Sequence, residues 1–467
     1  MSAPLIISAS GLRGIVGKTV TPELATRYGA ALGIFLRERN PDGLSGRYVL
    51  VGRDSRTSGE LLAAAAAAGL CGAGVSARLT GVGPTPTHLL AVGDDPDAVG
   101  GLIVTASHNP VEWNGIKLAA PDGRFVTPED GERISELAGR DPDYAGWNEL
   151  GEMAEMPGVV EHHLERILGL ELVAVEALRS ARPTVAVDCV HGAGGLVVPE
   201  LLRRLGCEVV GIGTTPDGRF PRDPEPSAEN LGELSALVRR SGAEVGLAVD
   251  PDSDRLAIVD ERGRPIGEDW TLALAAELVL GHRVGPVVTN LSSSQCIEDV
   301  ARAAGAPFHR SAVGEANVAG VMARVDAVIG GEGNGGVMLP ELNLTRDAPL
   351  ACALVLSLCA ERGERVGRLL EGRRRYHMVK RKTPRPEAPM TAIIGTLREA
   401  MGSDAEADTT DGLRLAWPDD SEWLHVRPSG TEPILRIITE SPDAERAEAL
   451  ADRAAACVAR ASGAGEE

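Results

Sequence analysis

The sequence is poor in aromatic residues and has no long apolar run. Phe, Trp and Tyr make up 3% of its 467 residues, so aliphatic side chains must fill any core. No apolar run of about 18 residues occurs, which is the length that a membrane span needs. The N-terminus also lacks a basic segment followed by an apolar one, the pattern of a signal peptide. We therefore expect a cytoplasmic protein with no membrane partner.

Positive charge is scarce as well. The chain has 47 Lys and Arg against 67 Asp and Glu, a formal net charge of −20. Such a charge repels nucleic acids and anionic membranes, so neither is expected as a partner. A small anionic substrate requires a local cluster of arginines and lysines that overrides the global charge.

Several familiar motifs are missing. The seven cysteines are widely spaced and form no Cys-x-x-Cys pair, which predicts free thiols in a reducing compartment. No Walker A motif and no Gly-x-Ser-x-Gly motif occur, which argues against nucleotide hydrolysis and acyl transfer.

A strand–helix–strand pattern occurs three times. It covers residues 48–79, 185–211 and 287–310, with a glycine near the end of each helix. This pattern is typical of βαβ units with parallel strands and right-handed crossovers. It predicts an α/β protein with three tandem related domains that contain mixed sheets.

The sequence changes character after residue 370. A basic cluster and two prolines are followed by helical segments at 390–401 and 444–461, which flank three strand-like runs. Helices beside a small antiparallel sheet predict an α+β domain. The predicted domains are residues 1–150, 151–255, 256–370 and 371–467.

Two segments point to phosphoryl chemistry. Residues 105–110 read Thr-Ala-Ser-His-Asn-Pro and place the hydroxyl of Ser107 on a turn after an apolar strand. Asp250, Asp252 and Asp254 alternate after another such strand, so their oxygens can converge on one cation. Oxygen ligands alone suit Mg²⁺. Each segment alone can be a plain polar turn, but together they predict a phosphorylatable serine beside a divalent cation.

An EF-hand calcium loop is the main alternative for the aspartate segment, because Glu261 falls at loop position 12. However, Pro251 and Arg255 replace the usual residues, and the glycine needed at the sharp turn is absent. Strand-like residues flank the loop on both sides, so Mg²⁺ is favoured.

Residues 331–336 match Gly-x-Gly-x-x-Gly after a strand. No helix start follows, so the dinucleotide-binding interpretation fails. The loop sets Glu332 and Asn334 among residues with little bulk, which suits hydrogen bonds to adjacent sugar hydroxyls. A tight glycine hairpin without a ligand is the alternative.

A fourth segment combines a guanidinium, two hydroxyls and a glycine turn in Arg427, Ser429, Gly430 and Thr431. Such groups are suited to grip a phosphate.

Further basic residues lie at Arg13 and in the Arg-Asp-Ser-Arg segment at residues 53–56. They either add positive charge around the same site or form surface ion pairs. Five histidines lack ligand-like partners and are interpreted as structural: His88, His162, His163, His282 and His377.

Residues 105–110, 250–255, 331–336 and 427–433 resemble, in this order, the four signature loops of the α-D-phosphohexomutase superfamily. The resemblance covers nearly the whole chain. It implies three related α/β domains and a fourth of a different type around a central cleft. It also implies transfer of a phosphoryl group between the 1- and 6-positions of a hexose phosphate.

The resemblance implies roles for individual residues. Ser107 would carry the phosphoryl group and would hold one Mg²⁺ ion together with Asp250, Asp252 and Asp254. Lys117 would act as acid or base, with Arg13 and His108 shaping the electrostatic field. Substrate-binding roles would fall to Arg255, Glu332, Asn334, Arg427, Ser429, Gly430 and Thr431. A hexose 1,6-bisphosphate would be the activator.

One position departs from the pattern. Other branches of the superfamily carry Ser-Gly-His near the end of the sugar loop, whereas this chain reads Asn334-Gly335-Gly336. The role of that histidine is therefore unassigned. This version of the loop, together with residues 110–114 and 313–317, resembles a branch often labelled phosphoglucosamine mutase. Glucosamine phosphate is thus the first expectation, and mannose or glucose phosphate the second.

Two further classes of function remain open. If water reaches the phosphoserine, the protein is a sugar-phosphate phosphatase. A non-catalytic sugar-phosphate sensor needs neither Ser107 nor the three aspartates. We expect a monomer or homodimer whose partner is a small sugar phosphate.

Overall fold

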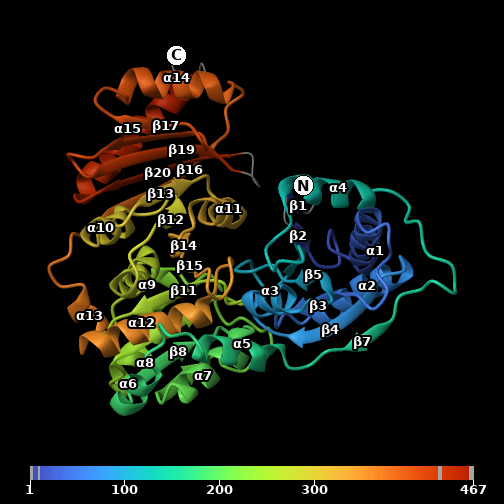
Figure 1. Ribbon diagram of the computed structural model, residues 1–467. Coiled ribbons are helices and arrows are strands. Elements are labelled where there is room, and N and C mark those ends of the chain that lie inside the picture. Colours follow the sequence, from blue (N-terminus) through green and yellow to red (C-terminus); the bar gives the residue numbers. More distant parts are fainter. Residues whose placement is uncertain (1–3, 9–10, 430–433, 462–467) are drawn as a thin grey trace.

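The computed structural model describes residues 4–8, 11–429 and 434–461. Four sheets follow one another along the chain, and each comes from one stretch of sequence (Figure 1). Three of them combine parallel and antiparallel strands, and the last is antiparallel throughout. The predicted fold class is confirmed.

The first sheet has the strand order β1-β2-β6-β5-β3-β4-β7. Its strands are β1 (Leu5–Ser8), β2 (Gly11–Ile15), β3 (Tyr48–Arg53), β4 (Ser76–Val82), β5 (Ala98–Val104), β6 (Trp113–Ala119) and β7 (Met153–Glu155). Its helices are α1 (Pro22–Arg39), α2 (Gly59–Gly72), α3 (Thr85–Asp94) and α4 (Pro128–Ala138). Helices α1 and α2 pack closely, because a Cβ atom at Gly29 would lie 2.0 Å from the carbonyl oxygen of Ala66. The abundance of small residues thus permits close contact between helices.

The second sheet has the order β11-β10-β8-β9, and the third the order β13-β12-β14-β15. The strands of the second are β8 (Thr184–Asp188), β9 (Glu208–Ile212), β10 (Val245–Val249) and β11 (Leu256–Val259). Those of the third are β12 (Val287–Asn290), β13 (Phe308–Ser311), β14 (Ile329–Glu332) and β15 (Gly336–Met338).

Among the described residues, nine helices surround these two sheets, and all of them except α8 and α11 contribute buried residues to one apolar core. They are α5 (Val159–Leu168), α6 (Val175–Ala181), α7 (Gly194–Arg204), α8 (Gly232–Ser241), α9 (Asp269–His282), α10 (Gln295–Ala303), α11 (Glu315–Val325), α12 (Ala348–Arg362) and α13 (Val366–Leu369), with a 3-10 turn at Ala228–Asn230. Leu201 of α7, Leu272 of α9 and Leu354 of α12 are fully buried in this core. The second and third sheets are therefore joined by apolar packing.

The three predicted βαβ units are present as β3-α2-β4, β8-α7-β9 and β12-α10-β13, each with parallel strands. The division of the chain at 150/151, 255/256 and 370/371 stays a prediction. Strand β11, which begins at Leu256, pairs with β10 of the second sheet.

The C-terminal sheet has the order β16-β20-β19-β18-β17. Its elements are β16 (His377–Pro384), α14 (Met390–Met401), β17 (Glu406–Asp408), β18 (Leu413–Trp417), β19 (Glu422–Pro428), β20 (Ile434–Ser441) and α15 (Ala444–Ala461). Both helices match the predicted bounds, and both pack with the sheet in an apolar core of their own. Strand β16 was missed, because its basic side chains lie on an edge strand whose pattern is not apolar.

Two predictions from composition can be compared with the described residues. All seven cysteines are free thiols, and five of them are buried. No helix in the described ranges has the length and apolar character that a membrane span requires.

Candidate active site

The turn between β5 and β6 holds Ser107 in an unusual backbone conformation. Its φ is +50°, and its side chain is buried. Its N–H donates to Thr105 Oγ1 (2.9 Å). A non-glycine residue in the left-handed region carries strain, which is typical of functional turns.

The buried guanidinium of Arg56 fixes this turn. It donates to Asp54 Oδ2 (3.1 Å) and to the carbonyl oxygens of four turn residues, at 2.6–2.9 Å: Ser107, Asn109, Pro110 and Trp113. Its donors are thus used within the protein, while Arg53 pairs with the exposed Glu60. The segment 53–56 does not supply the free positive charge that the sequence suggested as one option.

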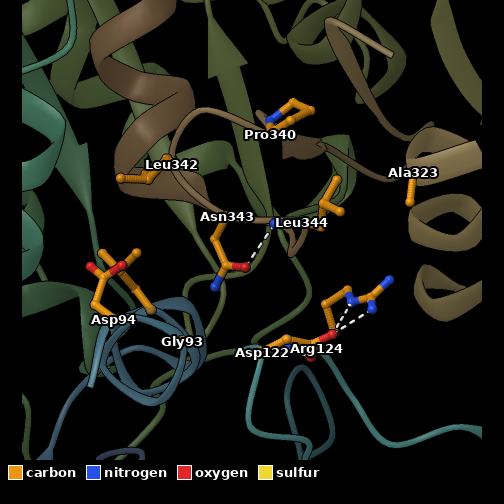
Figure 2. Close-up of a pocket in the computed structure, with 10 residues that line it drawn as sticks. Gly93, Asp94, Asp122, Arg124, Ala323, Pro340, Leu342, Asn343 and Leu344 are labelled. Carbon is orange, nitrogen blue, oxygen red and sulfur yellow. Dashed lines mark hydrogen bonds and ion pairs between the residues drawn. The ribbon is translucent and has the colours of Figure 1, made fainter. Parts of the chain in front are cut away.

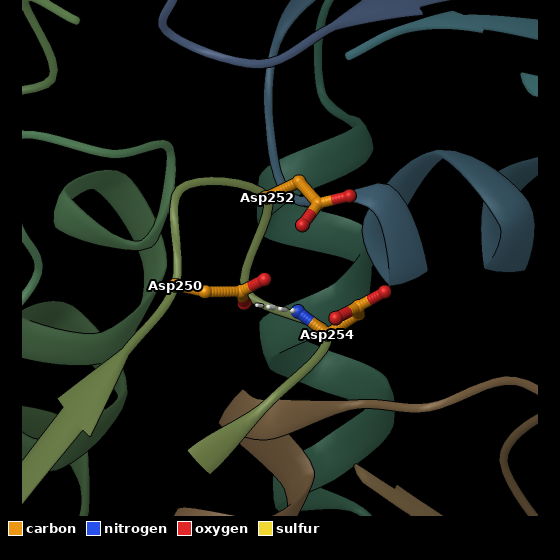
Figure 3. A group of neighbouring side chains, drawn as sticks. All are labelled: Asp250, Asp252 and Asp254. Atoms are coloured by element: carbon orange, nitrogen blue, oxygen red, sulfur yellow. Dashed lines mark hydrogen bonds between the residues drawn. The ribbon is translucent and has the colours of Figure 1, made fainter. Parts of the chain in front are cut away.

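Three carboxylates meet in the connection between β10 and β11. Asp250, Asp252 and Asp254 are buried, and each offers an oxygen within 4.8 Å of the others (Figure 3). The N–H of Asp254 donates to Asp250 Oδ1 (3.1 Å), which holds the loop closed. Ser107 Oγ donates to Asp250 Oδ2 (3.0 Å). The fold therefore brings together the two segments that are 143 residues apart.

The geometry of this loop fits a hard divalent cation. Asp252 Oδ1 and Asp254 Oδ1 are buried and have no hydrogen-bond partner. Buried carboxylate oxygens without partners are costly, and a bound cation would relieve that cost. Antiparallel strands flank the loop, so the EF-hand alternative is wrong. An all-oxygen donor set with room for water and phosphate suits Mg²⁺.

The pKa values of Asp250 and Asp252 are shifted in opposite directions. Burial and the neighbouring Asp254 and Asp252 raise the pKa of Asp250 well above its ordinary value. Burial would also raise the pKa of Asp252, but hydrogen bonds and the charge of Lys117 lower it overall. Lys117 Nζ lies 2.8 Å from Asp252 Oδ2, and Thr85 Oγ1 donates to the same oxygen (2.7 Å). The pKa of Lys117 is raised: burial lowers it, but Asp252 and Asp254 outweigh that effect.

Arginine side chains lie close enough to His108, the neighbour of Ser107 in sequence, to affect its charge. Arg255, burial and Arg13 lower the pKa of His108 well below its ordinary value, so its imidazole is neutral near pH 7. Arg13 donates to Asn109 Oδ1 (3.1 Å), and Arg255 donates to Glu225 Oε1 (3.1 Å). This is the local cationic cluster that an anionic substrate requires on an acidic protein.

The predicted sugar loop is a tight hairpin between β14 and β15, with Glu332 opposite Gly336. Its Glu332 is buried, and its Oε1 accepts from Asn290 Nδ2 (2.9 Å) and from the N–H of Gly314 (3.1 Å). Asn334 Oδ1 accepts from the N–H of Gly336 (3.3 Å). The loop is thus a tight glycine hairpin, and both predicted polar side chains, Glu332 and Asn334, accept hydrogen bonds within the protein. Their contact with a sugar stays a prediction.

Sequence reasoning missed two residues of this site. Thr85, at the start of α3, holds Asp252, and Arg346 connects the metal loop with the sugar loop through Asp254 and Glu332. Neither lies in a recognisable motif. The one local signal was the helix start after Arg346, where Asp347 caps α12.

The predicted phosphate-binding segment is described only in part. Arg427 Nε donates to Asp411 Oδ2 (2.7 Å), and the N–H of Ser429 donates to the carbonyl oxygen of Ile434 (2.9 Å). Asp411 Oδ2 also accepts from the N–H of Val313 (3.1 Å), which links this segment to the third sheet. Gly430 and Thr431 lie outside the described residues.

A separate cavity of about 380 Å³ is lined by α3, the turn after β6, α11 and the loop after β15 (Figure 2). Asp122 and Arg124 line it and pair with each other across 2.7 Å, and Asn343 points into it from the loop after β15. None of the predicted site residues lines it. It is therefore distinct from the site around Ser107.

Family comparisons cover nearly the whole chain. Residues 5–144, 161–263 and 267–376 match phosphoglucomutase/phosphomannomutase, alpha/beta/alpha domains I, II and III, in that order. Residues 378–456 match the C-terminal domain of the same family.

Relatives and solved structures agree with these matches. The chain is 39% identical to a phosphoglucomutase/phosphomannomutase of Thermococcus kodakarensis, over 94% of each chain. It is 38% identical to a probable phosphoglucosamine mutase of Methanopyrus kandleri, over 95% of each chain. A crystal structure of a phosphoglucomutase/phosphomannomutase family protein from Burkholderia thailandensis superposes with a TM-score of 0.84, at 26% identity and 99% coverage of both chains. A putative phosphomannomutase from Thermus thermophilus gives 0.80 at 26% identity, over 98% of this chain and 100% of the other.

Proposed function

The chain belongs to the phosphoglucomutase/phosphomannomutase family of phosphohexomutases, which are isomerases, and we propose that it interconverts glucosamine 6-phosphate and glucosamine 1-phosphate. The observation that carries the proposal is the contact of Ser107 Oγ with Asp250 beside two buried carboxylate oxygens that accept no hydrogen bond. That arrangement suits a phosphoserine next to a divalent cation.

In the proposed reaction, a phosphoryl group on Ser107 Oγ passes to the free hydroxyl of a sugar monophosphate. The P–Oγ bond breaks, a P–O bond to the sugar forms, and the proton of the hydroxyl leaves to a nearby base. The resulting bisphosphate turns around and returns its other phosphoryl group to Ser107. Such transfers depend mainly on in-line positioning and charge neutralisation.

We assign roles by position. Asp250, Asp252 and Asp254 would hold one Mg²⁺ ion, which when bound neutralises charge on the transferring phosphoryl group. Lys117 forms ion pairs with Asp252 and Asp254, and in the proposal it would exchange a proton with the reacting oxygens. His108, Arg13 and Arg255 would surround the phosphoryl group. The sugar would bind Glu332 and Asn334, and its second phosphate would bind Arg427, Ser429, Gly430 and Thr431.

The proposal of glucosamine phosphate as the substrate rests on the names of the relatives. Several of them, at 32–38% identity, are called probable phosphoglucosamine mutases, including that of Pyrococcus abyssi at 35%. The Thermococcus protein supports phosphomannomutase/phosphoglucomutase activity as the alternative. A hexose 1,6-bisphosphate is the proposed activator, because it phosphorylates Ser107 at the start of turnover.

A single-turnover experiment tests this proposal. Protein phosphorylated with a hexose bisphosphate is freed of excess reagent and mixed with glucosamine 1-phosphate and Mg²⁺. We expect intact-mass spectrometry to show loss of the phosphoryl group from the protein as a glucosamine bisphosphate forms. If the protein loses the group as inorganic phosphate at the same rate without sugar, the protein is a phosphatase and the proposal is wrong.

A further inference from the structure

Arg346 links three segments of the site. Its Nη2 donates to Asp254 Oδ2 (2.5 Å), its Nη1 to Glu332 Oε2 (2.8 Å) and its Nε to Glu315 Oε2 (3.1 Å). These carboxylates come from the metal loop, the sugar loop and the first turn of α11. A planar guanidinium can address three such partners at once, whereas the single ammonium group of lysine cannot hold the same geometry.

The side chain of Arg346 also fills the space beside the last glycine of the sugar loop. A Cβ atom at Gly336 would lie 2.3 Å from Cδ and 2.7 Å from Cγ of Arg346. The φ of Gly336 is not in the left-handed region, in contrast to that of Gly335 at +88°. The backbone conformation of the turn therefore does not require glycine at position 336. Glycine is required there because the side chain of Arg346 occupies the adjacent space.

Gly336 is the last residue of the predicted sugar loop and pairs with Glu332 across the hairpin. Any residue with a Cβ atom at position 336 would overlap the side chain of Arg346 where it now lies. The observed position of Arg346 therefore depends on glycine at position 336, because a side chain there would force the arginine to move.

We propose that Arg346 is a positioning residue whose side chain occupies the space left open beside Gly336. It holds the metal loop and the sugar loop in one register by gripping Asp254 and Glu332 together. For its effect on turnover this inference rests on the proposed function. The contact between Arg346 and Gly336 does not depend on the proposed function.

The first test is a double-mutant cycle in urea, on the full chain without sugar or metal. We expect Gly336→Ala to lower the urea midpoint in the wild-type background, because the added methyl group displaces Arg346. In the Arg346→Ala background the same substitution should leave the midpoint unchanged. Gly320→Ala is the matched control, since nothing lies within 4 Å of that Cβ position, and it should not lower the midpoint. Equal losses from Gly336→Ala in both backgrounds would overturn the pairing.

The second test measures binding of Mn²⁺ by electron paramagnetic resonance. Arg346→Lys keeps the positive charge but loses the planar guanidinium group with its several N–H donors. We expect Mn²⁺ affinity to fall about tenfold or more. Arg414→Lys makes the same change at another buried arginine, in β18, and should leave the affinity unchanged. Unchanged affinity in Arg346→Lys would overturn the positioning role.

Turnover separates this inference from the proposed function. In an active protein, Arg346→Lys should lower kcat by about 10–100-fold, in parallel with the loss of Mn²⁺ affinity. If the wild type lacks mutase activity while the cycle and the Mn²⁺ result are as expected, the proposed function fails and the role of Arg346 stands.

Discussion

At the scale of single residues, Ser107 is the proposed nucleophile and has a strained backbone conformation. Its φ of +50° costs about 1–2 kcal/mol relative to an ordinary conformation, and glycine does not incur this cost. Both Ser107→Ala and Ser107→Gly lose the hydrogen bond to Asp250. We expect the glycine variant to be about 1 kcal/mol more stable than the alanine variant in urea unfolding. Both should lose turnover by more than about 10³-fold, as expected for loss of a nucleophile.

Two outcomes would contradict these expectations for Ser107. Equal stability of the two variants would mean that the turn is not strained at Ser107. Residual turnover near the wild-type level would mean that another group carries the phosphoryl group.

His88 gives a pH dependence whose sign can be worked out. Burial lowers its pKa from 6.5 to about 4, so the folded state keeps the imidazole neutral. Between these two values the unfolded chain binds the proton more strongly, and stability is lost as the pH falls from 6.5 towards 4. Between pH 7 and pH 5 the wild type should lose about 2 kcal/mol more unfolding free energy than His88→Gln. Parallel pH profiles of the two proteins in urea titrations would contradict this.

Which site residues could be predicted depended on whether they stand in a motif. Ser107 and the three aspartates occur in short segments with a recognisable chemical pattern, and the structure brings them together. Arg346 could not be predicted, because its role follows from three carboxylates that are distant in sequence and from the absence of a side chain at Gly336.

At the scale of elements, one arginine holds the turn between β5 and β6. Arg56 donates to four carbonyl oxygens there and to Asp54, and it has no exposed side-chain surface. Arg56→Lys cannot reproduce these contacts and deprives the buried Asp54 of its guanidinium partner, although Thr105 Oγ1 and the N–H of residue 56 still donate to it. We expect a loss of about 3 kcal/mol or more in unfolding free energy.

A neighbouring arginine supplies the control. Arg53 lies three residues earlier and forms an ion pair with the exposed side chain of Glu60, so Arg53→Lys should change stability by less than about 0.5 kcal/mol. Similar losses in the two variants would show that the turn does not depend on Arg56.

Elements were predictable where apolar periodicity was strong. The βαβ units and both helices of the C-terminal region follow from such patterns. Strand β16 did not, because alternating basic residues on an edge strand look like a solvated segment until β20 pairs with them.

At the scale of the whole molecule, the C-terminal domain packs as a unit of its own. Its apolar core is separate from the core shared by the second and third sheets. Among the described residues, its contacts to the third sheet include polar ones, such as Asp411 with the N–H of Val313 and Glu440 with the N–H of Gln295. Figure 1 shows this domain beside β13, α10 and α11, at one end of the molecule. Polar interfaces of this kind permit rigid-body motion.

We therefore predict closure of the C-terminal domain when a sugar bisphosphate binds. X-ray scattering should show a smaller radius of gyration with hexose 1,6-bisphosphate than without it. Arg427→Ala removes a proposed phosphate contact and should abolish the change. Superimposable profiles of the free and saturated wild type would contradict the prediction.

The central claim is that a phosphoryl group moves between two positions of one hexose through Ser107. The most direct measurement is ³¹P NMR of the protein with Mg²⁺ and a trace of hexose bisphosphate. The 1-phosphates of glucosamine, glucose and mannose are supplied in parallel samples. We predict growth of a 6-phosphate signal, fastest with glucosamine 1-phosphate and absent with Ser107→Ala. Accumulation of inorganic phosphate without any 6-phosphate would contradict the account.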